Sequence, residues 1–135
     1  MIGSRLTRYR DVGLLILRIG IGAAFIAHGW PKLTGGPKLW EGIGHALPLP
    51  APVFWGFMAA LAEGLGGLLF LTGFLFRPVC VLLLIDMLVA ITFHLHSGNA
   101  SMSSFSSGWS HPLEDAVVFL ALIFVGPGKY SVDRV

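Results

Sequence analysis

Long apolar stretches dominate this chain and restrict what it can fold into. A helix needs roughly 17–25 residues to cross the hydrocarbon core of a bilayer. Hydrophobic residues make up 55% of the 135-residue chain and charged residues only 12%, about half the charged share of a soluble domain. The sequence therefore predicts one all-helical membrane domain, a four-helix transmembrane bundle. The expected spans cover about 12–30, 53–76, 79–96 and 112–125.

The connections between these stretches also carry local signals. Pro31 is expected to end the first span, and the short fourth span is expected to start in a sheltered position or where the bilayer thins. In the first outer connection, Leu39, Trp40 and Ile43 recur at helical spacing and predict a short interfacial helix. The second outer connection, 97–110, is rich in Ser and Gly and predicts a plain loop.

The distribution of Lys and Arg predicts the orientation of the chain. Cytoplasmic connections of membrane proteins carry an excess of these residues. One side of the predicted bundle has only Lys32 and Lys38, so both termini are expected in the cytoplasm. The basic residues of the other side are Arg5, Arg8, Arg10, Arg77, Lys129 and Arg134.

Two ionisable residues, Arg18 and Asp86, lie deep inside the predicted spans. Such groups cost roughly 2.5–3.5 kcal/mol each on insertion scales and are usually paired or functional. Counted from the inner ends of their helices, they lie at depths of roughly 9 and 10 Å. Because these depths match, we expect a structural ion pair that sets the register of the two helices.

A second group of ionisable residues falls in the outer half of the bundle. Glu63, His28, His94 and Glu114 lie roughly 20–24 Å from the inner side by the same count. Each predicted helix thus sends one titratable side chain to one layer, which predicts a functional site. His111 and Asp115 are nearly level with this layer, and Lys32 lies one turn beyond His28.

Alternative interpretations exist for several of these residues. Glu114 and Asp115 lie in the first turn after Pro112, where acidic side chains favour the helix dipole. His111 is compatible with a cap or a loop residue. The small-residue ladder Gly56-Ala60-Gly64 is explained by close helix packing, and it also permits a homo-oligomer.

The outer layer contains groups that carry protons near neutral pH. Imidazoles and carboxylates could bind the carbonyl ends of a quinone and supply its protons. They are also compatible with a metal ion or a bis-His haem, although the sequence has no CxxCH and no HExxH motif. No specific metal ligands are assigned. The single Cys80 excludes an internal disulfide, and the few basic residues do not form a nucleic-acid-binding patch.

The order and spacing of several short motifs resemble the DoxX family of small bacterial membrane proteins. The first stretch reads LLILRIGIGAAFIAHGWPKL and the second AEGLGGLLFLTGFLFRP. The third reads MLVAITFHLHSG, and GPGKYSVD near the end is similar to the closing signature of the family. The residues that carry the resemblance include Arg18, His28, Gly29, Lys32, Glu63, Gly66, Gly67, Gly73, Arg77, Ala90, His94, Gly98 and Glu114.

The resemblance implies a multi-pass protein of the bacterial inner membrane with a role linked to redox chemistry. Some members of that family are quinone-reactive subunits, as in thiosulfate:quinone oxidoreductase. Others are thought to join membrane complexes with superoxide dismutase and a sulfurtransferase. We therefore expect a quinone-interacting subunit with lipid and redox proteins as partners. The alternative is a non-enzymatic assembly component, or one that handles protons, small solutes or metals.

Overall fold

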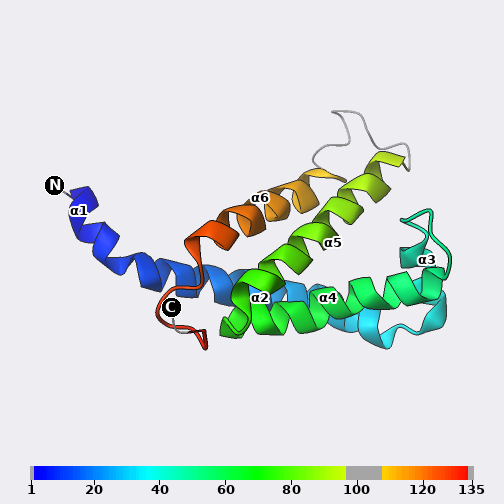
Figure 1. The fold of residues 1–135 in the computed structure, drawn as a ribbon, viewed down its shortest axis with the longest axis horizontal. Coiled ribbons are helices and arrows are strands. Elements are labelled where there is room, and N and C mark those ends of the chain that lie inside the picture. The colour runs from blue at the N-terminus through cyan, green and yellow to red at the C-terminus, as the bar shows by residue number, and fades with distance from the viewer. Residues whose placement is uncertain (1, 97–107, 134–135) are drawn as a thin grey trace.

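Every regular element in the described part of the chain is a helix. The computed structural model describes residues 2–96 and 108–133, so most of the predicted Ser-rich loop lies outside the described residues. Helices α4 and α2 run alongside one another, and α5 runs alongside α6 (Figure 1). The elements are α1 (Ile2–Leu6), the 3-10 helix η1 (Thr7–Tyr9), α2 (Arg10–Thr34), α3 (Pro37–Gly44), α4 (Pro52–Thr72), α5 (Phe76–His96) and α6 (Ser110–Val125).

Three of these helical stretches are long and apolar enough to cross a membrane. Within the described residues they are Gly3–Thr34, Pro52–Thr72 and Phe76–Leu95. Helix α6 has 16 residues, which is short for a helix that crosses the hydrocarbon core. The all-helical membrane class is confirmed, whereas the count of four spans is not.

The first long helix does not end where the sequence predicted. Pro31 lies inside α2, which continues to Thr34. A proline in the last turn removes one hydrogen bond, but here other groups satisfy the nearby carbonyls. The Trp40 indole donates to the Lys32 carbonyl at 2.8 Å, and the Thr34 hydroxyl donates to the Trp30 carbonyl at 3.0 Å. Trp40 belongs to α3, so the short helix predicted in this connection is present.

The turn between α4 and α5 also differs from the prediction. Helix α4 ends at Thr72 because Gly73 has φ 72° and its N–H bonds back to the Leu69 and Phe70 carbonyls. This left-handed glycine ends the helix four residues earlier than expected, and α5 begins at Phe76 instead of residue 79. The shift changes the relative height of every residue counted from these ends.

Helices α2 and α4 touch through glycine residues. A Cβ on Gly29 would clash with the main chain of Gly64, and one on Gly22 would lie 2.7 Å from the Leu71 Cβ. Close approach of two backbones is the known advantage of small residues in membrane helices. The α2–α4 contact therefore depends on missing side chains, whereas α5 and α6 pack through bulky ones. Those buried side chains include Phe76, Cys80, Leu83, Phe119 and Leu122.

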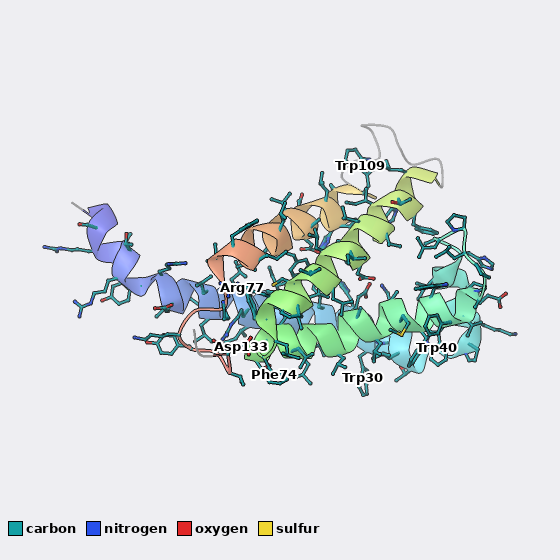
Figure 2. All side chains as sticks on the ribbon, viewed as in Figure 1. Trp30, Trp40, Phe74, Arg77, Trp109 and Asp133 are labelled. Atoms are coloured by element: carbon teal, nitrogen blue, oxygen red, sulfur yellow. The ribbon has the colours of Figure 1, made fainter. Side chains whose placement is uncertain are left out.

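The segment 126–133 returns from α6 and covers the α4–α5 turn. Main-chain N–H groups of Val132 and Asp133 donate to the Thr72 and Gly73 carbonyls. The Asp133 carboxylate accepts hydrogen bonds from Leu75 N–H at 3.1 Å and from Phe76 N–H at 2.8 Å, at the start of α5. We call this end of the bundle, formed by 10–18, 73–77 and 126–133, the terminal face. In Figure 2, Arg77 and Asp133 lie toward this face, while Trp40 and Trp109 lie toward the opposite end.

Candidate functional site

A partly buried ion pair joins α2 to α4. The Lys32 ammonium donates to both carboxylate oxygens of Glu63, at 2.9 and 2.8 Å. Glu63 is only 8% exposed, whereas the Lys32 side chain is 38% exposed. The two residues meet because the glycine contacts near Gly29 and Gly64 bring the two helices together at this level. Lys32 thus reaches the surface, while its partner lies inside the bundle.

A second carboxylate lies beside this pair. Asp86 of α5 interacts electrostatically most strongly with Glu63 and also with Lys32. Its Oδ2 atom is buried and has no hydrogen-bond partner. Glu63 lies nine residues before the end of α4 and Asp86 ten residues after the start of α5, about 14 and 15 Å from the turn. Lys32, Glu63 and Asp86, the carboxylate cluster, thus combine two acids with one base near the middle of α4 and α5.

The predicted pair between Arg18 and Asp86 is not formed. Among the described residues, Arg18 makes no ion pair, and it donates instead from Nη2 to the Tyr130 carbonyl. Its side chain is buried, with 2% of the residue exposed, and its Nε and Nη1 have no hydrogen-bond partner. The prediction failed because Arg18 packs against Gly73 in the α4–α5 turn, ten or more residues from Asp86 along α5.

The predicted histidine and acid positions form a second group between α2 and α6. The rings of His28 and His111 are edge to face, with centroids 6.5 Å apart. His111 Nδ1 lies 3.2 Å from an Asp115 oxygen, with side chains 75% and 18% exposed. The charge of Asp115 also interacts with His28 and Glu114. We call His28, His111 and Asp115 the histidine cluster; His28 lies one helical turn before Lys32 on α2.

The other two predicted site residues, Glu114 and His94, lie outside both the carboxylate cluster and the histidine cluster. Glu114 is exposed on α6. His94 is partly buried near the end of α5, where its ring lies 5.6 Å from that of Phe93. Their roles stay predictions. Within residues 2–96 and 108–133, no group of three His, Cys, Asp or Glu side chains is arranged to hold a metal ion.

Comparison with known proteins identifies the family. The family model described as DoxX matches residues 13–96, more than half of the chain. The chain belongs to the DoxX family. This match ends with α5, so α6 and the closing segment lie outside it. No solved structure matches this DoxX chain.

Curated relatives extend the similarity over nearly the whole chain. The DoxX chain is 32% identical to "Inner membrane protein YqjF" of Escherichia coli (strain K12), covering 94% of both proteins. It is 32% identical to "Inner membrane protein YphA" of the same organism, covering 93% of this chain and 91% of the relative. A third relative, "Uncharacterized membrane protein Rv3486" of Mycobacterium tuberculosis (strain ATCC 25618 / H37Rv), is 31% identical over 90% of this chain and 79% of its own length. This DoxX chain is therefore an integral membrane protein.

The proximity of Glu63 and Asp86 was not predicted from the sequence. The predicted helix ends at 76 and 79 assign the two residues to different layers. Gly73 was the available signal, since a glycine after an apolar helix commonly ends it in the left-handed conformation. Counting from Gly73 would have placed the two carboxylates within one helical turn of each other, at about 15 and 20 Å from the glycine.

Proposed function

We propose that this DoxX chain is a quinone-interacting subunit of a membrane redox complex that exchanges protons through the carboxylate cluster. The observation that carries the proposal is the unpaired, buried Oδ2 of Asp86 beside the Lys32–Glu63 pair. Two carboxylates lie near one ammonium group, which among the described residues donates only to Glu63. An extra negative charge there is costly, and a proton held between the acids removes it.

A shared proton is also one that can be exchanged. Loss of the proton leaves a second negative charge near Lys32. The positive charge of Lys32 stabilises this ionised form. The partly exposed ammonium of Lys32 marks the side from which protons reach the cluster. Glu63 and Asp86 thus have the chemistry of a proton donor and acceptor.

The donors around the cluster fit the head group of a quinone. A quinone presents carbonyl oxygens as acceptors and, when bound, supplies the chemistry of accepting two electrons and two protons. Lys32 has three N–H donors, two of which serve Glu63. The exposed ring of His28 lies one turn away on the same face of α2. Lys32 and His28 would therefore hold the head group, and Glu63 and Asp86 would supply protons.

The histidine cluster would then connect this site with the aqueous phase. His111 is largely exposed, contacts Asp115 and lies against His28, so it offers a path for protons at the end of the bundle opposite the terminal face. His94 and Glu114 are assigned to the same path. The electrons would come from a partner protein, as the family resemblance implies.

We also propose that the chain crosses the membrane four times and has both termini in the cytoplasm. Helix α6 packs along α5 through Phe119 and Leu122, which supports a fourth, short span. The arginines Arg10 and Arg77 lie at the terminal face, which supports the cytoplasmic side for that face by the positive-inside rule.

Quinone binding is tested with the purified protein in mild detergent. Solvent extraction measures any quinone that is retained, and titration with a short-chain quinone follows quenching of tryptophan fluorescence. Wild type is expected to bind saturably, and Lys32→Met to bind about tenfold more weakly because it loses a charged donor. Glu41→Gln, an exposed acid of α3, serves as the matched control and should bind like wild type. A wild-type protein that neither retains nor binds quinone contradicts this part of the proposal.

A second candidate is proton transfer without any quinone. It is favoured by the same carboxylate cluster, which needs no additional group to exchange a proton. The protein in liposomes with a pH gradient would then carry protons across the membrane, and Asp86→Asn would abolish this flux. If wild-type liposomes are no more permeable to protons than empty ones, this candidate is excluded.

A further inference from the structure

A basic pocket opens at the terminal face. It has a volume of about 250 Å³ and lies between the starts of α2 and α5 and the end of α6. Arg10, Arg77 and Lys129 line it together with one carboxylate, Asp11. Within residues 2–96 and 108–133, none of these three cations forms an ion pair with a carboxylate. The pocket therefore has an excess of two positive charges.

The two guanidinium groups are held in place by the end of α6. Arg77 Nε donates to the Ile123 carbonyl at 2.9 Å, and Arg10 Nη2 donates to the Val125 carbonyl at 3.4 Å. Each arginine has five N–H donors in a fixed planar fork. One bond to the main chain orients the fork and leaves most of its donors for another acceptor. Ordering these side chains would thus cost little when an anion binds.

The remaining parts of the wall keep the pocket open. The Asp11 carboxylate accepts a hydrogen bond from the main-chain N–H of Lys129 at 3.1 Å, so it shapes the loop and does not pair with the arginines. Gly126 has φ 83°, and a Cβ there would lie 3.2 Å from Arg77 Nη2. A side chain at this position would be strained and would crowd the guanidinium group. Glycine at position 126 thus leaves room for the Arg77 guanidinium group.

We propose that this pocket binds a phosphate group, carried by an anionic phospholipid or free in the aqueous phase. Arginine forks match the geometry of phosphate oxygens and bind them with charge-assisted hydrogen bonds. Leu14 is buried in the same wall and Val125 is exposed beside it, which offers an apolar surface next to the charged one. Such a site suits a lipid head group whose acyl chains extend into the bilayer.

The test compares two double variants that lose the same charge. Arg10→Gln/Arg77→Gln removes the two forks, whereas Arg5→Gln/Arg8→Gln removes two arginines of α1 and η1 that do not line the pocket. Native mass spectrometry measures binding of phosphatidylglycerol, phosphatidylcholine and inorganic phosphate to the full chain in detergent. Relative to wild type, the pocket variant is expected to bind phosphatidylglycerol roughly 10- to 30-fold more weakly. The control variant should stay within about twofold of wild type, since its arginines do not contact the ligand.

Lys129→Gln is a third variant, which tests the pocket even if Arg10→Gln/Arg77→Gln does not fold. It leaves both arginine bonds to α6 in place and should weaken binding by roughly fivefold. Retention of phosphatidylglycerol but not phosphatidylcholine identifies a lipid as the source, and saturable binding of inorganic phosphate alone identifies the aqueous source. Equal weakening in both double variants would show a diffuse surface charge and overturn the proposal. No binding of either phosphate probe by wild type would overturn it as well.

Discussion

The terminal face and the carboxylate cluster use charged side chains in opposite ways. At the terminal face, Arg18 and Arg77 donate to main-chain carbonyls, and Asp133 accepts from main-chain N–H groups. In the carboxylate cluster, the charged groups face one another. A side chain bonded to the backbone fixes a turn or a helix end, whereas charges that face one another can change their protonation without unfolding the chain. Arg18 and Asp133 are thus structural charges, whereas Glu63 and Asp86 are available for proton exchange, and Arg77 keeps donors free beyond its single bond to α6.

The comparison predicts that Arg18 and Asp133 contribute most to stability. Arg18→Ala is expected to lower the free energy of unfolding by about 2–3 kcal/mol, because it leaves a cavity where the buried side chain packs against Gly73 and removes the charge-assisted hydrogen bond to the Tyr130 carbonyl. Thermal unfolding in detergent measures the effect. The same substitution at exposed Arg8 in η1 should cost less than about 0.5 kcal/mol. Equal effects at the two positions would mean that Arg18 does not hold the closing segment.

Asp133 should have the next largest effect at this face. Asp133→Ala removes the acceptor for Leu75 N–H and Phe76 N–H at the start of α5 and is expected to cost about 1–2 kcal/mol. Asp133→Asn keeps a side-chain oxygen and should recover about half of that loss. Thermal unfolding with both variants provides the measurement. An Asp133→Ala protein as stable as wild type would show that Asp133 does not stabilise the start of α5.

The carboxylate cluster predicts an effect of the opposite sign. Asp86→Leu is expected to raise the free energy of unfolding by about 1 kcal/mol, because it replaces a half-buried acid, whose Oδ2 is shielded from solvent, by an apolar side chain of similar size. The same variant should lose proton exchange, as is common where a functional residue is kept at a cost in stability. Chemical denaturation gives the stability, and the exchangeable carboxyl band in infrared difference spectra gives the proton exchange. A clear loss of stability in Asp86→Leu would show instead that Asp86 stabilises the fold.

The smallest effect is expected in the histidine cluster. His111→Ala removes an exposed i,i+4 contact with Asp115 and should cost about 0.2–0.5 kcal/mol. Thermal unfolding in detergent measures the difference from wild type. A loss above about 1 kcal/mol would contradict a weak, exposed His111–Asp115 contact.

Much of the fold could be predicted from the sequence, because long apolar stretches between Gly- and Pro-rich connections leave few alternatives. The short helix at Trp40 followed from spacing, and the sequence predicted that His111 is level with His28 but not that their rings meet. The partner of Asp86 could not be found in the same way, because depth counting depends on the residue at which each helix ends. Pro31 did not end α2 and Gly73 ended α4 early, so the real heights differed from the counted ones. The role of Arg18 depends on the closing segment folding back, which no local pattern reveals.

Infrared difference spectroscopy tests the central claim, that Glu63 and Asp86 share an exchangeable proton. The wild-type protein is recorded through a pH titration, with Asp86→Asn, Glu63→Gln and the Glu41→Gln control beside it. The account predicts a protonated-carboxyl band in wild type and in the control that shifts in D2O and is absent from Asp86→Asn. A wild-type spectrum with no such band at any pH where the protein stays folded, or a band that persists unchanged in both cluster variants, would contradict it.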